Sequence, residues 1–335
     1  MIVLGIETSC DETAAAVCSG IELRSNIINT QNIHKEYGGV VPELASREHL
    51  KNIVPIVESA LSVADVKLNE VEAVCVTKGP GLAGALLIGV SYAKSVAFSL
   101  EVPVIGVNHI EAHLWAPVLE YPDLEPPFVG LIISGGHTQL WYVREFGDYI
   151  LIGQTLDDAV GEAFDKVAKM LDLDYPGGPE IDRLSREGDP EFHHFPRPHL
   201  KGANPDFSFS GLKTSVLYFL NSLSKDQIDK YKADIAASFQ QAVIDTLIQK
   251  TIRTAVKYNV DRLILGGGVS ANSGLKKQMT AAVNEKNIEV FIPSAEFCTD
   301  NAAMIAYTGY RKFVEQDYQD SLDFSPDPGL KLVNK

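Results

Sequence analysis

Two histidines, His109 and His113, stand four residues apart, just after an apolar run, Val104 to Val107, that is typical of a β-strand. In an α-helix, residues four apart lie about 40° from each other around the axis, so both imidazoles can face one metal ion. The pair therefore predicts half of a metal site. The alternative is that both are ordinary surface or helix-capping histidines.

The same spacing occurs in the His-Glu-x-x-His helix of zinc proteases, where the Glu directly after the first His acts on the metal-bound water. Here Ile110 occupies that position, and Glu111, two residues from His109, projects roughly 200° away from the metal face. The residues therefore indicate a metal without indicating peptide hydrolysis.

A third ligand could come from Asp300, which follows a predicted strand at the start of the last predicted helix. Its carboxylate would complete a His, His, Asp set, which suits zinc or iron and leaves coordination positions open for substrate. The alternative is that Asp300 only caps the helix.

The elements that must position these residues form a repeated pattern. Short apolar runs flank the polar turn 7–13, and two more flank the turn 134–138, so each set predicts a β-hairpin. A shift of 125 residues superposes Ser9 on Ser134. Turns of Gly, Ser and Thr can offer N–H groups and hydroxyls to phosphate. The repetition suggests two related lobes facing a nucleotide.

The rest of the chain alternates between strand and helix patterns, which predicts an α/β fold with mixed sheets. Gly266 to Gly268 follow a strand and open a helix, so this turn is a further candidate nucleotide contact, although it matches neither the dinucleotide nor the Walker motif. The predicted strands are 71–76, 103–107, 150–152, 262–265 and 289–292. The predicted helices are 42–63, one that ends near residue 100, 157–171, one that begins near residue 211, 226–258 and one that begins at residue 300. The predicted loops are 175–178 and 187–205.

Length and charge limit the class of protein. At 335 residues, two domains are the default. The net charge of -15 argues against non-specific nucleic-acid binding over the whole surface. Neither a signal peptide nor a membrane segment is expected, and four scattered cysteines fit a reducing cytoplasm. Two basic clusters could form local patches but are more often solvated surface: Arg47, His49 and Lys51, and His193, His194, Arg197, His199 and Lys201.

Ten segments along the chain form a characteristic series: 5–13, 38–43, 79–82, 108–113, 134–140, 161–166, 175–178, 209–214, 266–272 and 298–301. In order and spacing they resemble the TsaD family of bacterial threonylcarbamoyltransferases, which belongs to the actin-like ATPase superfamily. The resemblance implies a two-lobed actin-like ATPase (ribonuclease H-like) fold with mixed sheets flanked by helices. It implies an N-terminal lobe, 1–116, on which a C-terminal helix of about 305–335 packs, and a C-terminal lobe, 117–304.

The resemblance also implies an activity and its residues. The threonylcarbamoyl group of threonylcarbamoyl-AMP would be transferred to N6 of adenosine 37 in tRNAs that read ANN codons, in the cytoplasm. One divalent ion per chain, iron or zinc, would bind His109, His113 and Asp300, while Asp11 and Glu12 in the first phosphate loop would be catalytic. The adenylate, or ATP, ADP or AMP in the same cleft, would bind Ser134, Gly135, Gly136, His137, Thr138, Asp165, Gly178, Asp182 and Asn272.

The chemistry is consistent with such a site. A mixed carbamoyl phosphate anhydride is already activated, so the enzyme must mainly position an amine and stabilise charge developing on oxygen. A metal could orient the threonine moiety, and Asp11 could assist removal of the amine proton. Asp165 lies mid-helix, where a charge is usually only solvated, but acids near a nucleotide often bind ribose hydroxyls.

The resemblance further implies tRNA as a partner, together with proteins of the kinds called TsaB, a related chain, and TsaE, an ATPase. A homodimer is possible when these are absent. Three other classes remain as alternatives. An actin-like small-molecule kinase would use the two phosphate turns but leaves the His pair unexplained. A metallopeptidase is disfavoured by Ile110. A non-enzymatic scaffold is the third.

Overall fold

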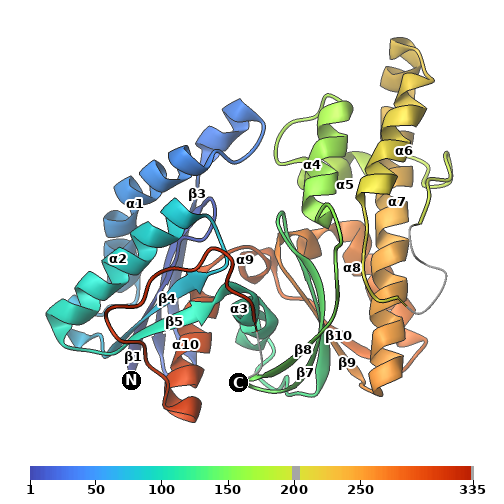
Figure 1. The fold of residues 1–335 in the computed structure, drawn as a ribbon. Helices are drawn as coiled ribbons and strands as arrows, with labels where there is room; N and C mark the ends of the chain where they lie inside the picture. Colours follow the sequence, from blue (N-terminus) through green and yellow to red (C-terminus); the bar gives the residue numbers. More distant parts are fainter. Residues whose placement is uncertain (198–203, 333–335) are drawn as a thin grey trace. The chain divides into compact units, whose positions relative to one another are not determined.

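Two five-stranded sheets of the same topology organise the chain (Figure 1). The computed structural model describes residues 1–197 and 204–332. The strand orders, β3-β2-β1-β4-β5 and β8-β7-β6-β9-β10, match one to one, and each sheet combines antiparallel with parallel pairs. The predicted mixed sheets and duplicated hairpins are confirmed. The strands are β1 (Ile2–Glu7), β2 (Glu12–Ser19), β3 (Glu22–Thr30), β4 (Ala73–Gly79), β5 (Val104–Asn108), β6 (Phe128–Ile133), β7 (Thr138–Glu145), β8 (Asp148–Gln154), β9 (Arg262–Gly266) and β10 (Glu289–Phe291).

Each sheet belongs to its own compact unit. Unit 1 comprises Met1–Asp123 with Thr299–Leu332, and unit 2 comprises Leu124–Cys298. The lobe boundaries predicted at 116 and 304 lie a few residues from these. His199 and Lys201 of the second basic cluster lie outside the described residues.

In unit 1, helices cover both faces of the sheet. Because successive strand residues point to opposite faces, Leu4 and Ile6 pack under α1 (Pro42–Val63) and α2 (Ala83–Leu100), whereas Val3 packs under α10 (Ala302–Gln316). The predicted helix 42–63 has the bounds of α1, with Pro42 in the first turn, where a missing N–H costs nothing. Short helices η1 (Asn32–Tyr37), η2 (Leu68–Glu70), α3 (His109–Trp115) and η3 (Ala116–Leu119) complete the unit.

Helix α2 is the one helix among the described residues that is long and apolar enough to cross a membrane by length and composition. Its buried face contributes Val90, Ala93 and Ala97 to the core of unit 1.

The C-terminal segment is helical over a shorter range than the predicted 305–335. Helix α10 ends at Gln316 because Asp317 takes the left-handed conformation, with φ 49°, which stops a helix. The chain then runs along the edge of β5, where the Asp320 N–H donates to the Val104 carbonyl at 2.9 Å. Residues 317–332 therefore cover an edge strand.

In unit 2, one large apolar core lies between the sheet and its helices. One prediction needs correction. The segment 175–178, predicted as a loop, contains the start of α5, because Gly177 has no Cβ to collide with Ala168 and Asp165 on the neighbouring helix. The segment 266–272 opens a helix as predicted: Gly268 begins a short 3-10 turn, and the helix itself begins at Ser273, after Asn272. The helices are α4 (Val160–Met170), α5 (Gly177–Ser185), α6 (Ser210–Asn221), α7 (Lys225–Tyr258), η4 (Gly268–Ala271), α8 (Ser273–Asn284) and α9 (Ala295–Cys298).

Candidate metal centre and nucleotide-binding loops

Helix α3 and the start of α10 supply the three predicted metal ligands in unit 1. The α3 N-terminus is fixed by Asn108, whose side-chain oxygen accepts from the Ile110 and Glu111 N–H groups at 2.9 and 3.2 Å. Asp300 does not cap α10, since the Asn301 side chain accepts from the Met304 N–H at 3.0 Å. The carboxylate of Asp300 is therefore available for another role, and the capping interpretation is wrong.

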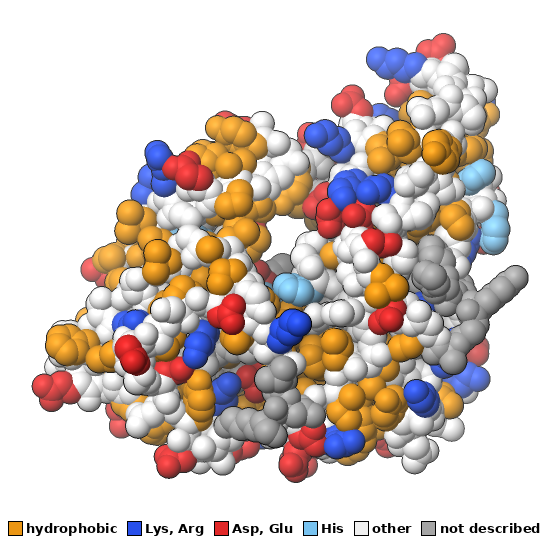
Figure 2. All heavy atoms as spheres, in the orientation of Figure 1, with side chains coloured by type: hydrophobic (Ala, Val, Ile, Leu, Met, Phe, Trp, Pro, Cys, Tyr) orange, Lys and Arg blue, Asp and Glu red, His pale blue; other side chains and the backbone are white. Residues whose placement is uncertain are grey.

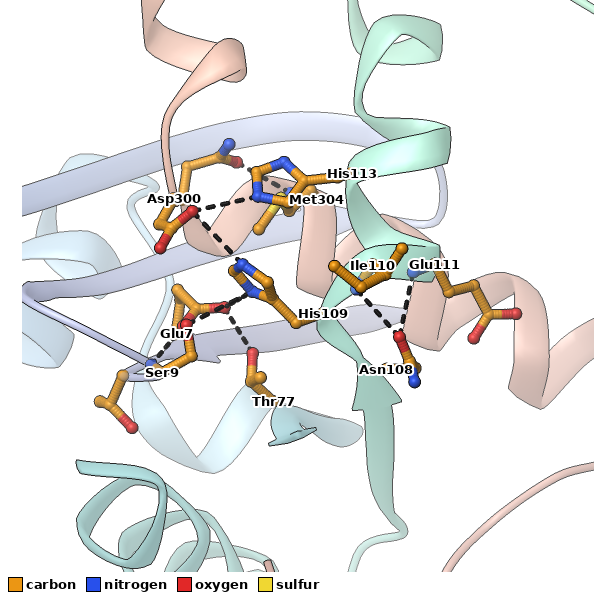
Figure 3. Close-up of polar contacts among 12 residues, drawn as sticks. Glu7, Ser9, Thr77, Asn108, His109, Ile110, Glu111, His113, Asp300 and Met304 are labelled. Carbon is orange, nitrogen blue, oxygen red and sulfur yellow. Dashed lines mark hydrogen bonds and ion pairs between the residues drawn. The ribbon is translucent and has the colours of Figure 1, made fainter. Parts of the chain in front are cut away.

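The three side chains converge on one point (Figure 3). Asp300 Oδ1 lies 3.0 Å from His113 Nε2 and 3.4 Å from His109 Nε2, and all three donor atoms are within 4.8 Å of one another. Donors bound about 2.1 Å from a tetrahedral metal lie about 3.4 Å apart. The donor types and their spacing therefore fit a single divalent ion.

Glu7, at the end of β1, orients the first histidine. Its Oε2 lies 3.2 Å from His109 Nδ1 and accepts from the Thr77 hydroxyl at 2.5 Å. With Nδ1–H directed to a carboxylate, Nε2 faces the other donors, an arrangement typical of metal-bound histidines. Among the described residues, His113 Nδ1 has no hydrogen-bond partner. Glu7 was not predicted, because its partner His109 lies 102 residues away and the local sequence carries no sign of this contact.

Burial and neighbouring charges shift the pKa values of His109, His113 and Asp300. Burial by itself lowers the pKa of His109, but the carboxylates of Asp300 and Glu7 outweigh it and raise the pKa well above its usual value. Burial and the charge on His109 lower the pKa of His113. Burial opposes ionisation of Asp300, yet both histidines hold its pKa far below the usual range. The neighbouring carboxylates therefore favour a proton on His109.

Of the predicted catalytic acids, Asp11 lies in the turn between β1 and β2 and Glu12 is the first residue of β2, close to this cluster. Burial, followed by the charges of Asp300 and Asp11, raises the pKa of Glu12 well above its usual value. Buried His49 of α1 braces the turn, because its Nε2 lies 2.9 Å from the Cys10 carbonyl and its Nδ1 lies 2.8 Å from the Thr13 hydroxyl. His49 therefore does not belong to a surface basic patch.

In unit 2, the predicted phosphate turn forms a tight connection between β6 and β7. The Ser134 N–H donates to the His137 carbonyl at 2.8 Å, and Thr138 Oγ1 accepts from the Val160 N–H at 2.8 Å. Nothing lies within 4 Å of the positions where Gly135 and Gly136 would carry a Cβ. The backbone between the two strands is thus open to a ligand.

The remaining predicted ligand-binding residues of unit 2 lie on α4 and α5 and at the start of α8. Asp165 is not simply solvated, since it accepts from the Gly177 N–H at 2.7 Å. Gly178, in the first turn of α5, has open space around it. Asp182 and Asn272 are joined through Gln240, which donates to the Asp182 carboxylate at 3.4 Å and accepts from the Asn272 amide at 2.7 Å.

Gln240 was not predicted, because nothing in its local sequence on α7 distinguishes it. Its partners lie far away in sequence, 58 residues for Asp182 and 32 for Asn272. Burial by itself raises the pKa of Asp182, but hydrogen bonds from Arg186 and Ser273 outweigh it, so its pKa lies below the usual value.

The topology is that of the actin-like ATPases. HypF from T. kodakarensis superposes with a TM-score of 0.64 at 15% identity, covering 95% of this chain and 48% of that one. Component A of the (R)-2-hydroxyglutaryl-CoA dehydratase of Acidaminococcus fermentans superposes with a TM-score of 0.56 at 14% identity, covering 94% and 99%. Likeness at such low identity shows the fold alone. The class is therefore a protein of actin-like ATPase fold with a buried His, His, Asp cluster.

The family follows from closer sequence relatives. The family profile of TsaD, tRNA N6-adenosine threonylcarbamoyltransferase, matches residues 22–307. Proteins of that description from Thermosipho africanus and Caldicellulosiruptor saccharolyticus are 49% and 46% identical to this chain. The first match covers 99% of this chain and 100% of the relative, and the second covers 100% of this chain and 99% of the relative. The chain belongs to the TsaD family of tRNA N6-adenosine threonylcarbamoyltransferases.

Proposed function

We propose that this threonylcarbamoyltransferase acts on adenosine 37 of ANN-reading tRNAs through the two sets of residues described above. The observation that carries the proposal is the buried convergence of His109, His113 and Asp300, in a chain 49% identical over its whole length to a member of the family. A sugar or small-molecule kinase has no use for this cluster. A zinc peptidase would need an acid where Ile110 stands.

We assign binding of the adenylate to unit 2. The open backbone at Gly135 and Gly136 suits phosphate oxygens, because N–H groups in a glycine turn approach an anion closely. Asp165 and Asp182 are the acceptors for hydroxyl groups, and Gly178 leaves room beside them. Ser134, His137, Thr138 and Asn272 shape the two turns through the hydrogen bonds given above.

The transfer breaks the bond between the carbamoyl carbon and the phosphate oxygen and forms a bond from that carbon to adenosine N6, so the N6 amine must lose a proton. Asp11 is the proposed proton acceptor. Burial and the neighbouring carboxylates raise the pKa of Glu12, which favours a protonated carboxyl that could donate a hydrogen bond to developing negative charge. A divalent ion held by His109, His113 and Asp300 would supply a positive charge for the oxygens of the threonine moiety. Iron and zinc both suit this donor set.

We further propose that the enzyme works in the cytoplasm with a TsaB-like chain and a TsaE-like ATPase. Large apolar side chains are exposed on α1 and α2, where Figure 2 shows hydrophobic groups gathered over the two helices; they include Leu50, Val54, Leu87 and Phe98. Such a surface is typical of a protein interface. We assign it to the TsaB-like chain, with a second copy of this chain as its occupant when that partner is absent.

Reconstitution tests the function. The chain is incubated with its partners, an ANN-reading tRNA, threonine, bicarbonate, ATP and an adenylate-forming enzyme, and the modified nucleoside is measured. We expect transfer by the wild type, its loss in His109→Ala and Asp300→Ala, and normal transfer by Arg144→Ala, which removes an exposed ion pair with Asp148 at the β7–β8 hairpin. Full transfer by a metal-free double variant of His109 and Asp300 would reject the metal centre.

The partner proposal has its own test. The chain alone should transfer weakly, and Leu50→Asp should weaken the response to a TsaB-like partner without lowering the melting temperature, because Leu50 is 64% exposed. Robust multi-turnover transfer by the single chain would contradict the need for partners.

A further inference from the structure

A buried ion pair joins the two elements that supply the metal ligands. Glu111 Oε2 lies 3.1 Å from Lys312 Nζ, and the two side chains are only 4% and 12% exposed. Glu111 stands on α3 between His109 and His113, and Lys312 stands on α10, which follows Asp300. Figure 3 shows Glu111 pointing away from the three ligands, so it takes no part in coordination.

Helix α3 needs such an anchor because it is short. It has seven residues, and helices of that length are marginal unless tertiary contacts hold them. Glu111 is two residues from each histidine, so its side chain projects roughly 200° from theirs around the helix axis. A rotation of α3 that moved the imidazoles away from Asp300 would also have to break the bond to Lys312.

Neighbouring contacts strengthen the junction. Lys312 lies 4.8 Å from the centre of the Tyr318 ring, and Arg311 lies 4.6 Å from the ring of Trp115, the last residue of α3. Helix α10 is itself fixed on the sheet, because a Cβ on Gly5 of β1 would lie 2.5 Å from the Ala302 carbonyl oxygen. The contacts between α3 and α10 therefore fix the position of α3 relative to the sheet.

We propose that Glu111 and Lys312 are positioning residues that hold His109 and His113 in register with Asp300 and thereby set the metal affinity of the cluster. This inference rests on the proposed metal centre. Outer partners that orient ligating residues typically change metal affinity by about 10- to 100-fold when removed. A purely structural ion pair would change the melting temperature and leave the metal affinity of the folded protein unchanged.

The test measures Co²⁺ binding to the full-length chain by competition with a chelator, together with the visible absorption of bound cobalt and the melting temperature. Glu111→Gln should weaken binding about 10- to 100-fold and alter the cobalt spectrum. Lys312→Arg, which keeps the charge and the reach, should retain the wild-type affinity. Asp245→Asn is the matched control, because it breaks a comparable 2.9 Å ion pair, with the largely buried Arg197, in unit 2 and not in the unit that holds α3 and α10. It should leave the affinity unchanged.

A second variant covers the case in which Glu111→Gln does not fold. Replacing both members of a buried pair avoids an uncompensated charge, so Glu111→Gln combined with Lys312→Met should fold but still bind cobalt at least tenfold more weakly than the wild type. A folded double variant with wild-type affinity and spectrum would overturn the inference and leave the metal centre intact. If His109→Ala bound cobalt as tightly as the wild type, both this inference and the proposed metal centre would be overturned.

Discussion

Replacement of His49 by Ala should destabilise unit 1 and impair transfer together. The His49 side chain is fully buried and bridges α1 to Cys10 and Thr13, the residues on either side of Asp11 and Glu12. Its loss leaves the Thr13 hydroxyl and the Cys10 carbonyl without this partner, and each such group costs about 1 to 3 kcal/mol. Because the Cys10 contact is only partly buried, we expect a loss of about 2 to 4 kcal/mol in the free energy of unfolding, before any cavity is counted.

The protonation state of His49 gives the prediction a second readout. Burial lowers the pKa of His49 in the folded protein. As the pH falls, His49 is therefore protonated in the unfolded chain at a higher pH than in the folded protein. The stabilisation is therefore full above about pH 6.5 and declines in more acidic solution. His49→Gln can keep the hydrogen bond to the Cys10 carbonyl but cannot titrate.

Urea unfolding of the wild type, His49→Ala and His49→Gln between pH 5 and 8 checks the reasoning. The difference between the wild type and His49→Gln should shrink toward pH 5, and transfer at neutral pH should fall most in His49→Ala. A His49→Ala variant within 1 kcal/mol of the wild type, or a difference that grows in acid, would refute the assigned role of His49.

Three further predictions concern the two sites. Asp300→Asn should weaken zinc binding at least about tenfold in a chelator competition; unchanged binding would exclude Asp300 as a ligand. Gly267→Ala should cost about 2 kcal/mol or more in urea unfolding, since φ is 85° there and a Cβ would lie 2.5 Å from the Ile133 carbonyl oxygen; a loss below 0.5 kcal/mol would contradict this. Asp182→Asn should weaken AMP binding in calorimetry while unit 2 stays folded, and its stabilising contribution, present in the wild type above about pH 4, should be lost in acid because its pKa is lowered.

Local sequence was sufficient where one element decides its own structure. The bounds of α1 follow from Pro42 at the start and from its buried stripe, and most strands are near-continuous apolar runs. Strand β3, Glu22–Thr30, was missed because as an edge strand it has mostly polar, half-buried residues. Helix α5 was missed because its first residues are glycines, which local propensity assigns to turns.

The candidate sites divide in the same way. His109 and His113 could be predicted because both sit on one helical turn, and Asp300 because it follows a strand. Glu7 and Lys312 could not, because their partners, His109 and Glu111, lie 102 and 201 residues away in sequence. His49 was misassigned for the same reason, since only tertiary contacts show that the side chain is buried.

The charges around the cluster argue for a cation independently of the family. Burial, followed by the charges of Asp300, Asp11 and Glu7, raises the pKa of Glu12, and the carboxylates of Asp300 and Glu7 raise the pKa of His109. Burying like charges is costly unless they are neutralised. The carboxylates that raise the pKa of His109 would also attract a divalent ion, and His109 would have to lose its proton to become a ligand. The charges around the cluster therefore favour the proposed cation on the same grounds as its geometry, without reference to the family.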